Sequence, residues 1–346
     1  MTAPSPNARL TVDTAAIAAN WRRFATAGGT AACGAAIKAN AYGLGAHEIA
    51  ATLIAAGCRD LFVAHWQEVA ALGPLPTDVR LAVMHGVDAA DMAFAFAAPA
   101  VPVLVTPAQI ATWKPTGRPC DVMVDTGMNR LGISPTEALS GLLDGLALDT
   151  LHSHLACAED RGHPQNERQR AAFANLAARI PARRHALANS GGIGLGPGYH
   201  FTLTRPGIGL YGGGPSPDSH PLAPVATLSA RILQCRTIPP GHSVGYGATF
   251  TAARPTRLAT VALGYADGYP RSLSNHGTAR AEGVTCPLVG RVSMDLAIFD
   301  VTDAPHLTES SFLDVDFDLA ATAAASGRSE YELLTGLGAR YARIYK

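Results

Sequence analysis

The sequence lacks an excess of charge of either sign. Lysine plus arginine and aspartate plus glutamate number 27 each among the 346 residues. A chain without net charge has no general electrostatic attraction to nucleic acid or to an anionic membrane surface. Charged residues make up 16% of the chain and hydrophobic residues 48%, which is typical of a well-buried globular enzyme and not of a disordered protein. We therefore expect a small-molecule substrate and no nucleic-acid or membrane partner.

The sequence also lacks paired cysteines and long apolar segments. Its six cysteines form no Cys-x-x-Cys pair, which indicates reduced core residues rather than a zinc site or a disulfide framework. Residues 1–9 contain no apolar core of signal-peptide length, and Pro99 and Pro102 interrupt the alanine-rich residues 92–105. No segment reaches the roughly 18 apolar residues of a membrane span. These absences predict a cytoplasmic protein without a metal site.

Short β-type segments alternate with helical ones over residues 12–212. The first helix is expected to carry Ile17, Trp21 and Phe24 at helical spacing. Strands are predicted at eight places, namely residues 33–37, 61–64, 80–84, 101–105, 121–125, 150–155, 184–188 and 206–211. This alternation predicts a parallel (β/α)8 TIM-like barrel of the α/β class, with an open doubly wound sheet as the alternative. No Gly-x-Gly-x-x-Gly follows the first strand, which disfavours a dinucleotide-binding sheet.

The character of the sequence changes after the glycine- and proline-rich residues 213–224. Beyond them, β-like segments are joined by turns such as Pro239-Pro240-Gly241, and helices are scarce. We assign residues 1–224, including a short N-terminal strand, to the barrel domain. Residues 225–346 are assigned to a C-terminal, mostly-β domain.

Lys38 stands at the exit of the first predicted strand, directly before a small, glycine-punctuated loop. An apolar surrounding lowers the pKa of a lysine, and a neutral amine can attack a carbonyl group. The alternative is a strand-end lysine that extends its charged head into solvent. This segment by itself does not decide between the two.

Other polar residues follow later strands of the predicted barrel. Arg130 follows the fifth, His154 ends the sixth, Asn189 and Ser190 follow the seventh, and Arg205 opens the eighth. Sites on this fold form at the carboxyl ends of the strands, so these side chains are expected at one rim. Together they suit an anionic, carbonyl-bearing cofactor and a carboxylate substrate.

Eight separate motifs, in order, resemble the alanine racemase family over nearly the full length. They are KANAYG (38–43), DTGMNRLG (125–132), SHLA (153–156), ANS (188–190), RPGIGLYG (205–212), VGYGATF (244–250), GYADGYPR (264–271) and VGRVSMD (289–295). The resemblance implies pyridoxal 5'-phosphate (PLP) bound on a (β/α)8 barrel, followed by a C-terminal β domain. It also implies interconversion of L- and D-alanine, which supplies D-alanine for peptidoglycan.

The resemblance assigns two bases. Lys38 would hold PLP covalently and act on one face of the substrate, and Tyr246 of the partner subunit would act on the opposite face. A tyrosine base needs neighbouring positive charge, and His154 and Arg205 are the family's candidates for that network. Arg205 is also expected to face the pyridine nitrogen of PLP, where its guanidinium can only donate.

The resemblance assigns the remaining site residues as well. The cofactor and its phosphate would be held by Tyr42, Asn189, Ser190, Gly207 and Ile208. Arg130 and Met294 would bind the substrate, while the entrance and its surroundings would consist of Tyr265, Arg271, Arg291 and Asp295. Because some of these come from the partner subunit, the active form is expected to be a head-to-tail homodimer with shared sites.

The sequence departs from the family's pattern at two positions of the expected site. Met123 stands where many members have a modified lysine that orients the equivalent of Arg130. Ala339 stands where many have a tyrosine, whose contact Tyr341 could take over. These departures leave open a racemase of wider range, acting on serine or other amino acids. A non-catalytic PLP-binding barrel is a weaker alternative because such proteins lack the β domain, and a related decarboxylase would carry a cysteine in place of Tyr246.

Overall fold

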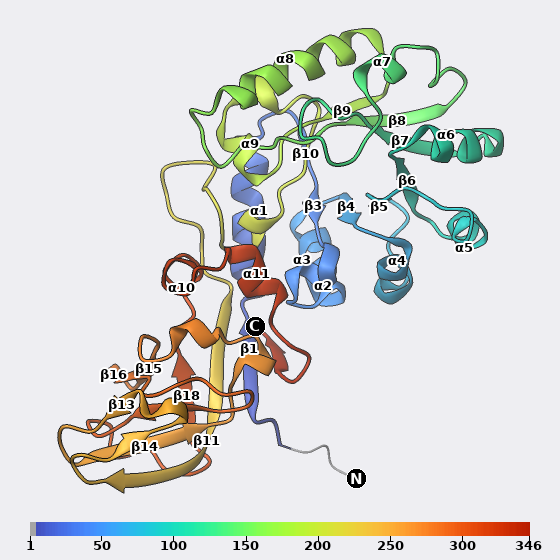
Figure 1. The fold of residues 1–346 in the computed structure, drawn as a ribbon. Coiled ribbons are helices and arrows are strands. Elements are labelled where there is room, and N and C mark those ends of the chain that lie inside the picture. The colour runs from blue at the N-terminus through green and yellow to red at the C-terminus, as the bar shows by residue number, and fades with distance from the viewer. Residues whose placement is uncertain (1–4) are drawn as a thin grey trace. The chain divides into compact units, whose positions relative to one another are not determined.

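The structure, a computed structural model, describes residues 5–346 and divides into two compact units. One unit consists of Ala15–Ala223, and the other combines the described residues up to Thr14 with Pro224–Lys346 (Figure 1). We call them the barrel unit and the β unit. Within residues 5–346, no helix has both the length and the apolar character that crossing a membrane requires.

Seven parallel strands form the sheet of the barrel unit in sequential order. They are β3 (Ala35–Ala36), β4 (Asp60–Val63), β5 (Arg80–Val83), β6 (Val101–Leu104), β7 (Pro119–Met123), β8 (Ala147–His152) and β9 (Arg184–Ala186). Side chains from different strands meet inside it, and the apolar cluster there comprises Phe62, Ala82, Val103, Val105, Met123, Ala186 and Leu203. The long apolar segments of the sequence are therefore strands with both faces buried, as expected for a parallel sheet.

Two further short strands bring the ends of this sheet together. In β2 (Ala32–Cys33), both residues pair in parallel with β10 (Leu203–Thr204), and the Arg205 amide donates to the Ala188 carbonyl at 2.8 Å. Gly34 separates β2 from β3, and a Cβ there would lie 2.6 Å from the Phe62 ring. The predicted (β/α)8 barrel fold is confirmed, with its first strand divided at this glycine into β2 and β3.

The eighth strand lies earlier in the sequence than predicted. Residues 206–211 are not a strand, because Ile208–Tyr211 forms a short 3-10 helix, η3. The amides of Gly207 and Gly209 donate to the Ser190 hydroxyl, so they are not available to a strand ladder. The segment is apolar and buried, which is why its composition resembled a strand.

The helices follow one another around the parallel sheet (Figure 1). They are α1 (Thr14–Ala27), α2 (Lys38–Tyr42), α3 (Ala46–Ala56), α4 (Trp66–Leu72), α5 (Met92–Ala97), α6 (Pro107–Trp113), α7 (Pro135–Ala138), α8 (Pro164–Arg179) and α9 (Ser190–Gly194). Helix α1 buries Ile17, Trp21 and Phe24, as its periodicity predicts.

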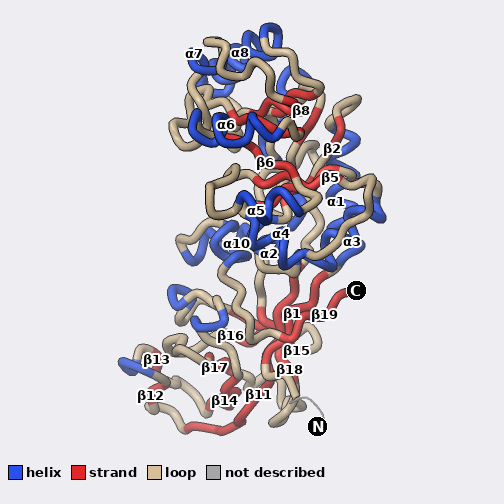
Figure 2. Tube along the Cα trace, turned by 90° about the vertical axis from the view of Figure 1, so that its right-hand side faces the viewer, coloured by secondary structure: helices blue, strands red, loops and turns tan. Residues whose placement is uncertain are grey.

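The β unit consists mostly of strands and loops (Figure 2). Its main sheet is ordered β16-β15-β18-β11-β1-β19, and β14 and β17 extend it from β11. The strands are β1 (Ala8–Val12), β11 (Ala226–Ile238), β14 (Thr256–Val261), β15 (Thr278–Ala281), β16 (Val284–Pro287), β17 (Ala297–Asp300), β18 (Phe312–Val315) and β19 (Ala342–Tyr345); the hairpin β12 (Ser243–Val244) and β13 (Phe250–Thr251) and the helices α10 (Leu319–Ser326) and α11 (Glu330–Thr335) complete the unit.

The N-terminal strand belongs to the β unit and not to the barrel. Strand β1 pairs antiparallel with β11 and parallel with β19, so it fills the position between them. The assignment of residues 1–224 to one domain therefore differs from the structure at its start. Alternating burial identifies β1 as a strand but does not reveal which sheet it joins.

The position of β1 between β11 and β19 predicts a large effect for Leu10→Ala. Leu10 is fully buried, and truncation of such a leucine costs about 2–5 kcal/mol of unfolding free energy. Thr11→Ala, at the half-buried neighbour, should cost less than about 1 kcal/mol. Denaturant titration followed by circular dichroism measures both, and equal small losses would show that β1 is not an integral part of the β unit.

Candidate active site

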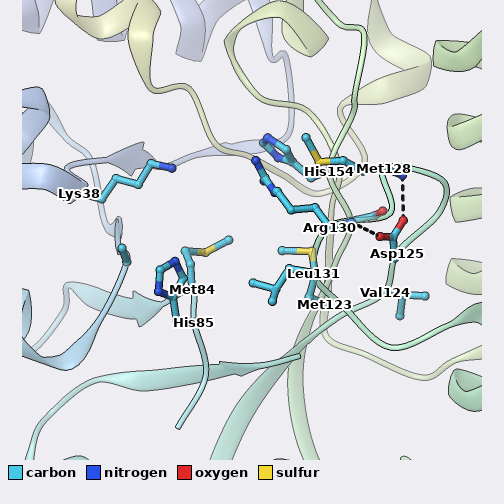
Figure 3. Close-up of a pocket in the computed structure, with 12 residues that line it drawn as sticks. Lys38, Met84, His85, Met123, Val124, Asp125, Met128, Arg130, Leu131 and His154 are labelled. Atoms are coloured by element: carbon cyan, nitrogen blue, oxygen red, sulfur yellow. Dashed lines mark hydrogen bonds between the residues drawn. The ribbon is translucent and has the colours of Figure 1, made fainter. Parts of the chain in front are cut away.

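A pocket of about 390 Å³ lies at the carboxyl ends of the barrel strands. Lys38 and Arg130 point toward one another into it from opposite sides, with His154 beside Arg130 (Figure 3). The remaining lining residues are Ala64, Met84, His85, Met123, Val124, Asp125, Met128, Leu131 and Ser153. Three of the side chains predicted to share a site therefore do so.

Lys38 is placed by an unusual backbone. The four residues that follow it, Ala39 to Tyr42, have φ between 51° and 55°, which makes one left-handed helical turn. Each such residue costs roughly 1–2 kcal/mol when it is not glycine. Hydrogen bonds fix the turn: the Glu68 carboxylate accepts from the Ala39 amide at 2.5 Å, and the Asn40 side chain accepts from the Ala46 amide at 2.8 Å.

The surroundings of Lys38 favour its neutral form. Burial lowers the pKa of the Lys38 amine, and the positive charge of Arg130 lowers it further. Glu68 acts in the opposite direction, but its carboxylate accepts hydrogen bonds from the amides of Ala39 and Ala64. The side chain also stays accessible from solvent. An accessible amine of lowered pKa is suited to attack a carbonyl carbon.

Hydroxyl groups and backbone amides gather around Gly207. The Ser190 hydroxyl accepts from the amides of Gly207 at 2.9 Å and Gly209 at 3.2 Å. A Cβ on Gly207 would lie only 2.4 Å from the Tyr42 hydroxyl oxygen. Burial raises the pKa of Tyr42 to about 12, so this hydroxyl keeps its proton. Asn189 accepts from the Gly192 amide at 2.9 Å and so caps α9, the helix that begins at Ser190.

Arg205 is buried next to this group and contacts a residue that the sequence analysis missed. Its guanidinium lies 3.1 Å from His152 Nδ1 and donates to the Ser153 carbonyl at 2.6 Å. His152 and His154 lie two residues apart, and alternate residues of an extended chain share a face, so this spacing could have revealed His152. Burial and the charge of Arg205 lower the pKa of His154 to about 3, so its imidazole is neutral.

The loop that carries Arg130 is organised by Asp125. The Asp125 carboxylate accepts from the amides of Gly127, Met128 and Arg130, and these bonds hold its pKa below the ordinary value against the effect of burial. Arg130 itself is exposed to the pocket. Met123, at the place of the family's modified lysine, is buried and lines the same pocket with an apolar side chain.

Five of the predicted site residues of the second domain, all except Asp295, gather in a cleft of the β unit, about 600 Å³ in volume. Tyr246 is 72% exposed and Met294 54%. Tyr246 lies in the loop between β12 and β13, flanked by Gly245 and Gly247, both at φ 72°. An aromatic residue that packed within its own turn would be buried, so Tyr246 does not serve to pack this turn. The cleft is lined by Tyr246, Tyr265, Arg271, Arg291, Val292, Ser293, Met294 and Arg328.

Asp295 and Tyr341 lie outside this cleft. The Asp295 carboxylate pairs with Arg340 at 2.7 Å, and Arg340 also pairs with Asp267 at 2.8 Å. Tyr341 is 4% exposed in the interior of the β unit. It therefore does not take over a contact at the surface of the cleft.

The left-handed turn predicts opposite effects for two glycine substitutions. Ala51→Gly, at an exposed position inside α3, should lower the unfolding free energy by about 1 kcal/mol. Ala39→Gly, at an exposed position of the turn, should raise it by up to about 1 kcal/mol, because glycine adopts positive φ without a steric penalty. Thermal and denaturant unfolding compare the two, and similar losses for both would contradict a strained turn.

The chain matches known proteins along nearly its whole length. Residues 12–215 match the family model "Alanine racemase, N-terminal domain", and residues 225–345 match "Alanine racemase, C-terminal domain". The alanine racemase of Acidiphilium cryptum is 45% identical, and the alignment covers 97% of this chain and 98% of that protein. The catabolic alanine racemase of Agrobacterium fabrum is 44% identical, with 97% and 91% covered.

Solved structures that resemble this chain are also alanine racemases. The alanine racemase from Bartonella henselae, solved with covalently bound pyridoxal phosphate, has a TM-score of 0.90 at 38% identity, covering 99% of this chain and 100% of that one. The biosynthetic alanine racemase from Pseudomonas aeruginosa has a TM-score of 0.87 at 32% identity, with 99% and 100% covered. The resemblance carried by the eight motifs is thus confirmed, and the chain belongs to the alanine racemase family.

Proposed function

We propose that this chain is a PLP-dependent racemase that interconverts L- and D-alanine with two bases, Lys38 and Tyr246. The observation that carries the proposal is the position and environment of the Lys38 amine. Its amine has a lowered pKa, stays accessible, and faces Arg130 across a pocket at the carboxyl ends of the barrel strands. The family to which the chain belongs supplies the reaction.

The barrel unit fits PLP. The hydroxyls of Tyr42 and Ser190 and the backbone at Gly207 and Ile208 would hold the phosphate. A Cβ on Gly207 would lie only 2.4 Å from the Tyr42 hydroxyl oxygen, so glycine is what allows Tyr42 to approach the backbone here. Asn189 would act through Ser190, since it caps the helix that begins there. Arg205 would face the ring nitrogen, with His154 beside it. Bound PLP supplies an electron sink that makes the substrate Cα–H acidic.

The two bases divide the proton transfers between them. Lys38 would take the proton from one face of the substrate Cα, a role that its lowered pKa favours. Tyr246 of the partner subunit delivers a proton to the opposite face, and the roles reverse in the other direction. Positioned bases of this kind contribute roughly 10²–10⁴-fold each.

Arg130 is the group that we assign to the substrate carboxylate. Its guanidinium is exposed to the pocket opposite Lys38, and guanidinium groups bind carboxylates in a bidentate manner. Met294 would contact the substrate from the partner subunit. Arg271 and Arg291, together with Tyr265, would line the entrance, and Asp295 would act only through Arg340.

The second base implies a head-to-tail homodimer with shared sites. Tyr246, Tyr265 and Met294 expose 72%, 42% and 54% of their surface in the β unit, although all three are large and hydrophobic. Clustered exposed side chains of this kind mark interaction surfaces. We propose that they complete the partner's pocket.

A second candidate function differs in the amino acids that the enzyme accepts as substrates. Met84, Met123 and Met128 line the pocket of Lys38, and methionine side chains adapt to ligands of different shape. A racemase that also accepts serine is therefore the second candidate. A non-catalytic PLP-binding barrel has less support, because the β unit presents Tyr246.

The cellular setting that we propose is the cytoplasm. There the enzyme would supply D-alanine for peptidoglycan. The matched relatives include alanine racemases named catabolic as well as biosynthetic, so a catabolic role is the alternative.

Substitution of each base tests the mechanism. Lys38→Ala should abolish racemisation and visible absorbance of bound PLP, and Tyr246→Phe should slow racemisation by roughly 10²–10⁴-fold. In D2O, Tyr246→Phe should still exchange the α-proton of one enantiomer only, since Lys38 serves one face. Tyr331→Phe, on α11 outside the cleft, is the control and should leave both activities unchanged. Exchange of both enantiomers at equal rates in Tyr246→Phe would contradict the two-base assignment.

Mixing the two inactive variants tests the shared site. If Lys38 of one subunit works with Tyr246 of its partner, a random mixture of Lys38→Ala and Tyr246→Phe subunits contains one intact site in half of the dimers, or about a quarter of wild-type activity. Sites confined to single subunits would give no recovery after mixing. Kinetic assays on the mixture after subunit exchange distinguish these results.

A further inference from the structure

A buried histidine that the proposed mechanism does not use lies between Arg205 and a buried aspartate. His152 and Asp121 are both 0% exposed. His152 Nδ1 is 3.1 Å from Arg205 Nη1, and its other ring nitrogen, Nε2, is 3.0 Å from Asp121 Oδ2. The three side chains therefore form one continuous chain inside the barrel.

The chemistry of the two neighbours fixes the state of His152. A guanidinium can only donate, so the Nδ1 that faces Arg205 must carry a lone pair. A carboxylate can only accept, so the Nε2 that faces Asp121 must carry the proton. Burial and Arg205 lower the pKa of His152 to about 4, although Asp121 acts in the opposite direction. The ring is thus neutral, in a single tautomer, with each nitrogen matched to its partner.

Asp121 is itself held from a second side. Its Oδ1 accepts from Arg80 Nη2 and from the Thr150 amide, the latter at 3.0 Å. Arg80 also pairs with Asp149 at 3.3 Å. Asp121 and His152 lie on adjacent strands, β7 and β8, within the hydrogen-bonded register. The carboxylate is therefore fixed at both oxygens and has no freedom to turn away from His152.

We propose that Asp121 and His152 are positioning residues that set the orientation of the Arg205 guanidinium toward the cofactor. The inference rests on the proposed function, in which Arg205 faces the PLP ring. His152 and the Ser153 carbonyl accept two of the five guanidinium N–H groups, and these two contacts define the guanidinium plane. Without His152, one contact remains and the plane is free to rotate about it.

Two substitutions of His152 separate this role from general packing. The side-chain oxygen of asparagine takes the place of Nδ1, so His152→Asn keeps an acceptor for Arg205 and loses the contact with Asp121. The side-chain amide of glutamine takes the place of Nε2, so His152→Gln keeps the donor to Asp121 and loses the contact with Arg205. Each variant loses one hydrogen bond, so similar decreases in thermal stability are expected.

The test compares the two variants as PLP-loaded enzymes. His152→Asn should retain the visible absorption maximum of bound PLP and a kcat within about threefold of wild type. His152→Gln should shift that maximum and lower kcat by roughly tenfold or more with less effect on KM, the size of effect that loss of a supporting partner has at other sites. If both variants kept the wild-type absorption maximum and kcat, or if both changed them to the same extent, the proposal would be overturned.

A third variant, Asp121→Asn, tests the same proposal without substituting His152. The side-chain amide of asparagine can donate to His152 Nε2, and the ring proton then moves to Nδ1. Nδ1 becomes a donor that faces the guanidinium of Arg205, which is also a donor. The expected result is the absorption shift of His152→Gln, and a wild-type spectrum would overturn the proposal.

Wild-type protein that binds PLP and racemises alanine establishes the proposed function first. A wild type that does neither refutes that function, whereas a functional wild type with indistinguishable variants refutes only the role of Asp121 and His152.

Discussion

The left-handed turn after Lys38 is the constraint on which the site depends. Four residues in a disfavoured backbone conformation, Ala39 to Tyr42, turn the chain soon after the end of the first strand. The same turn leaves Lys38 in the pocket and brings Tyr42 to Gly207. Non-glycine residues persist in this conformation only where their surroundings determine it, and here Glu68 and the Asn40 side chain do so.

The electrostatic environment of the pocket determines the reactivity of Lys38. Burial lowers the pKa of the Lys38 amine most, and the positive charge of Arg130 across the pocket lowers it further. His154 adds no charge because its imidazole is neutral. The same positive charge suits an anionic cofactor and a carboxylate substrate. The positive charge of Arg130 therefore acts in two ways: it lowers the pKa of Lys38 further, and it favours anionic ligands.

Much of the barrel could be predicted from the sequence, because buried parallel strands are continuous apolar segments between turn residues. The eighth strand was misplaced because residues 206–211 are just as apolar, although the amides of Gly207 and Gly209 bond to Ser190. The joining of Lys38, Arg130 and His154 followed from the rule that sites form at strand ends. The left-handed turn could not be foreseen, since alanine and tyrosine have no preference for positive φ. His152 was missed although it lies only two residues before His154, because a buried histidine commonly serves only packing.

The role of Lys38 is tested most directly by chemical identification of the lysine that carries PLP. The chain has three lysines, Lys38, Lys114 and Lys346. Borohydride makes a lysine linkage to PLP permanent, and peptide mapping by mass spectrometry then locates it. We expect one PLP per chain, on Lys38 alone. Label on Lys114 or Lys346, or spread over all three, would contradict it.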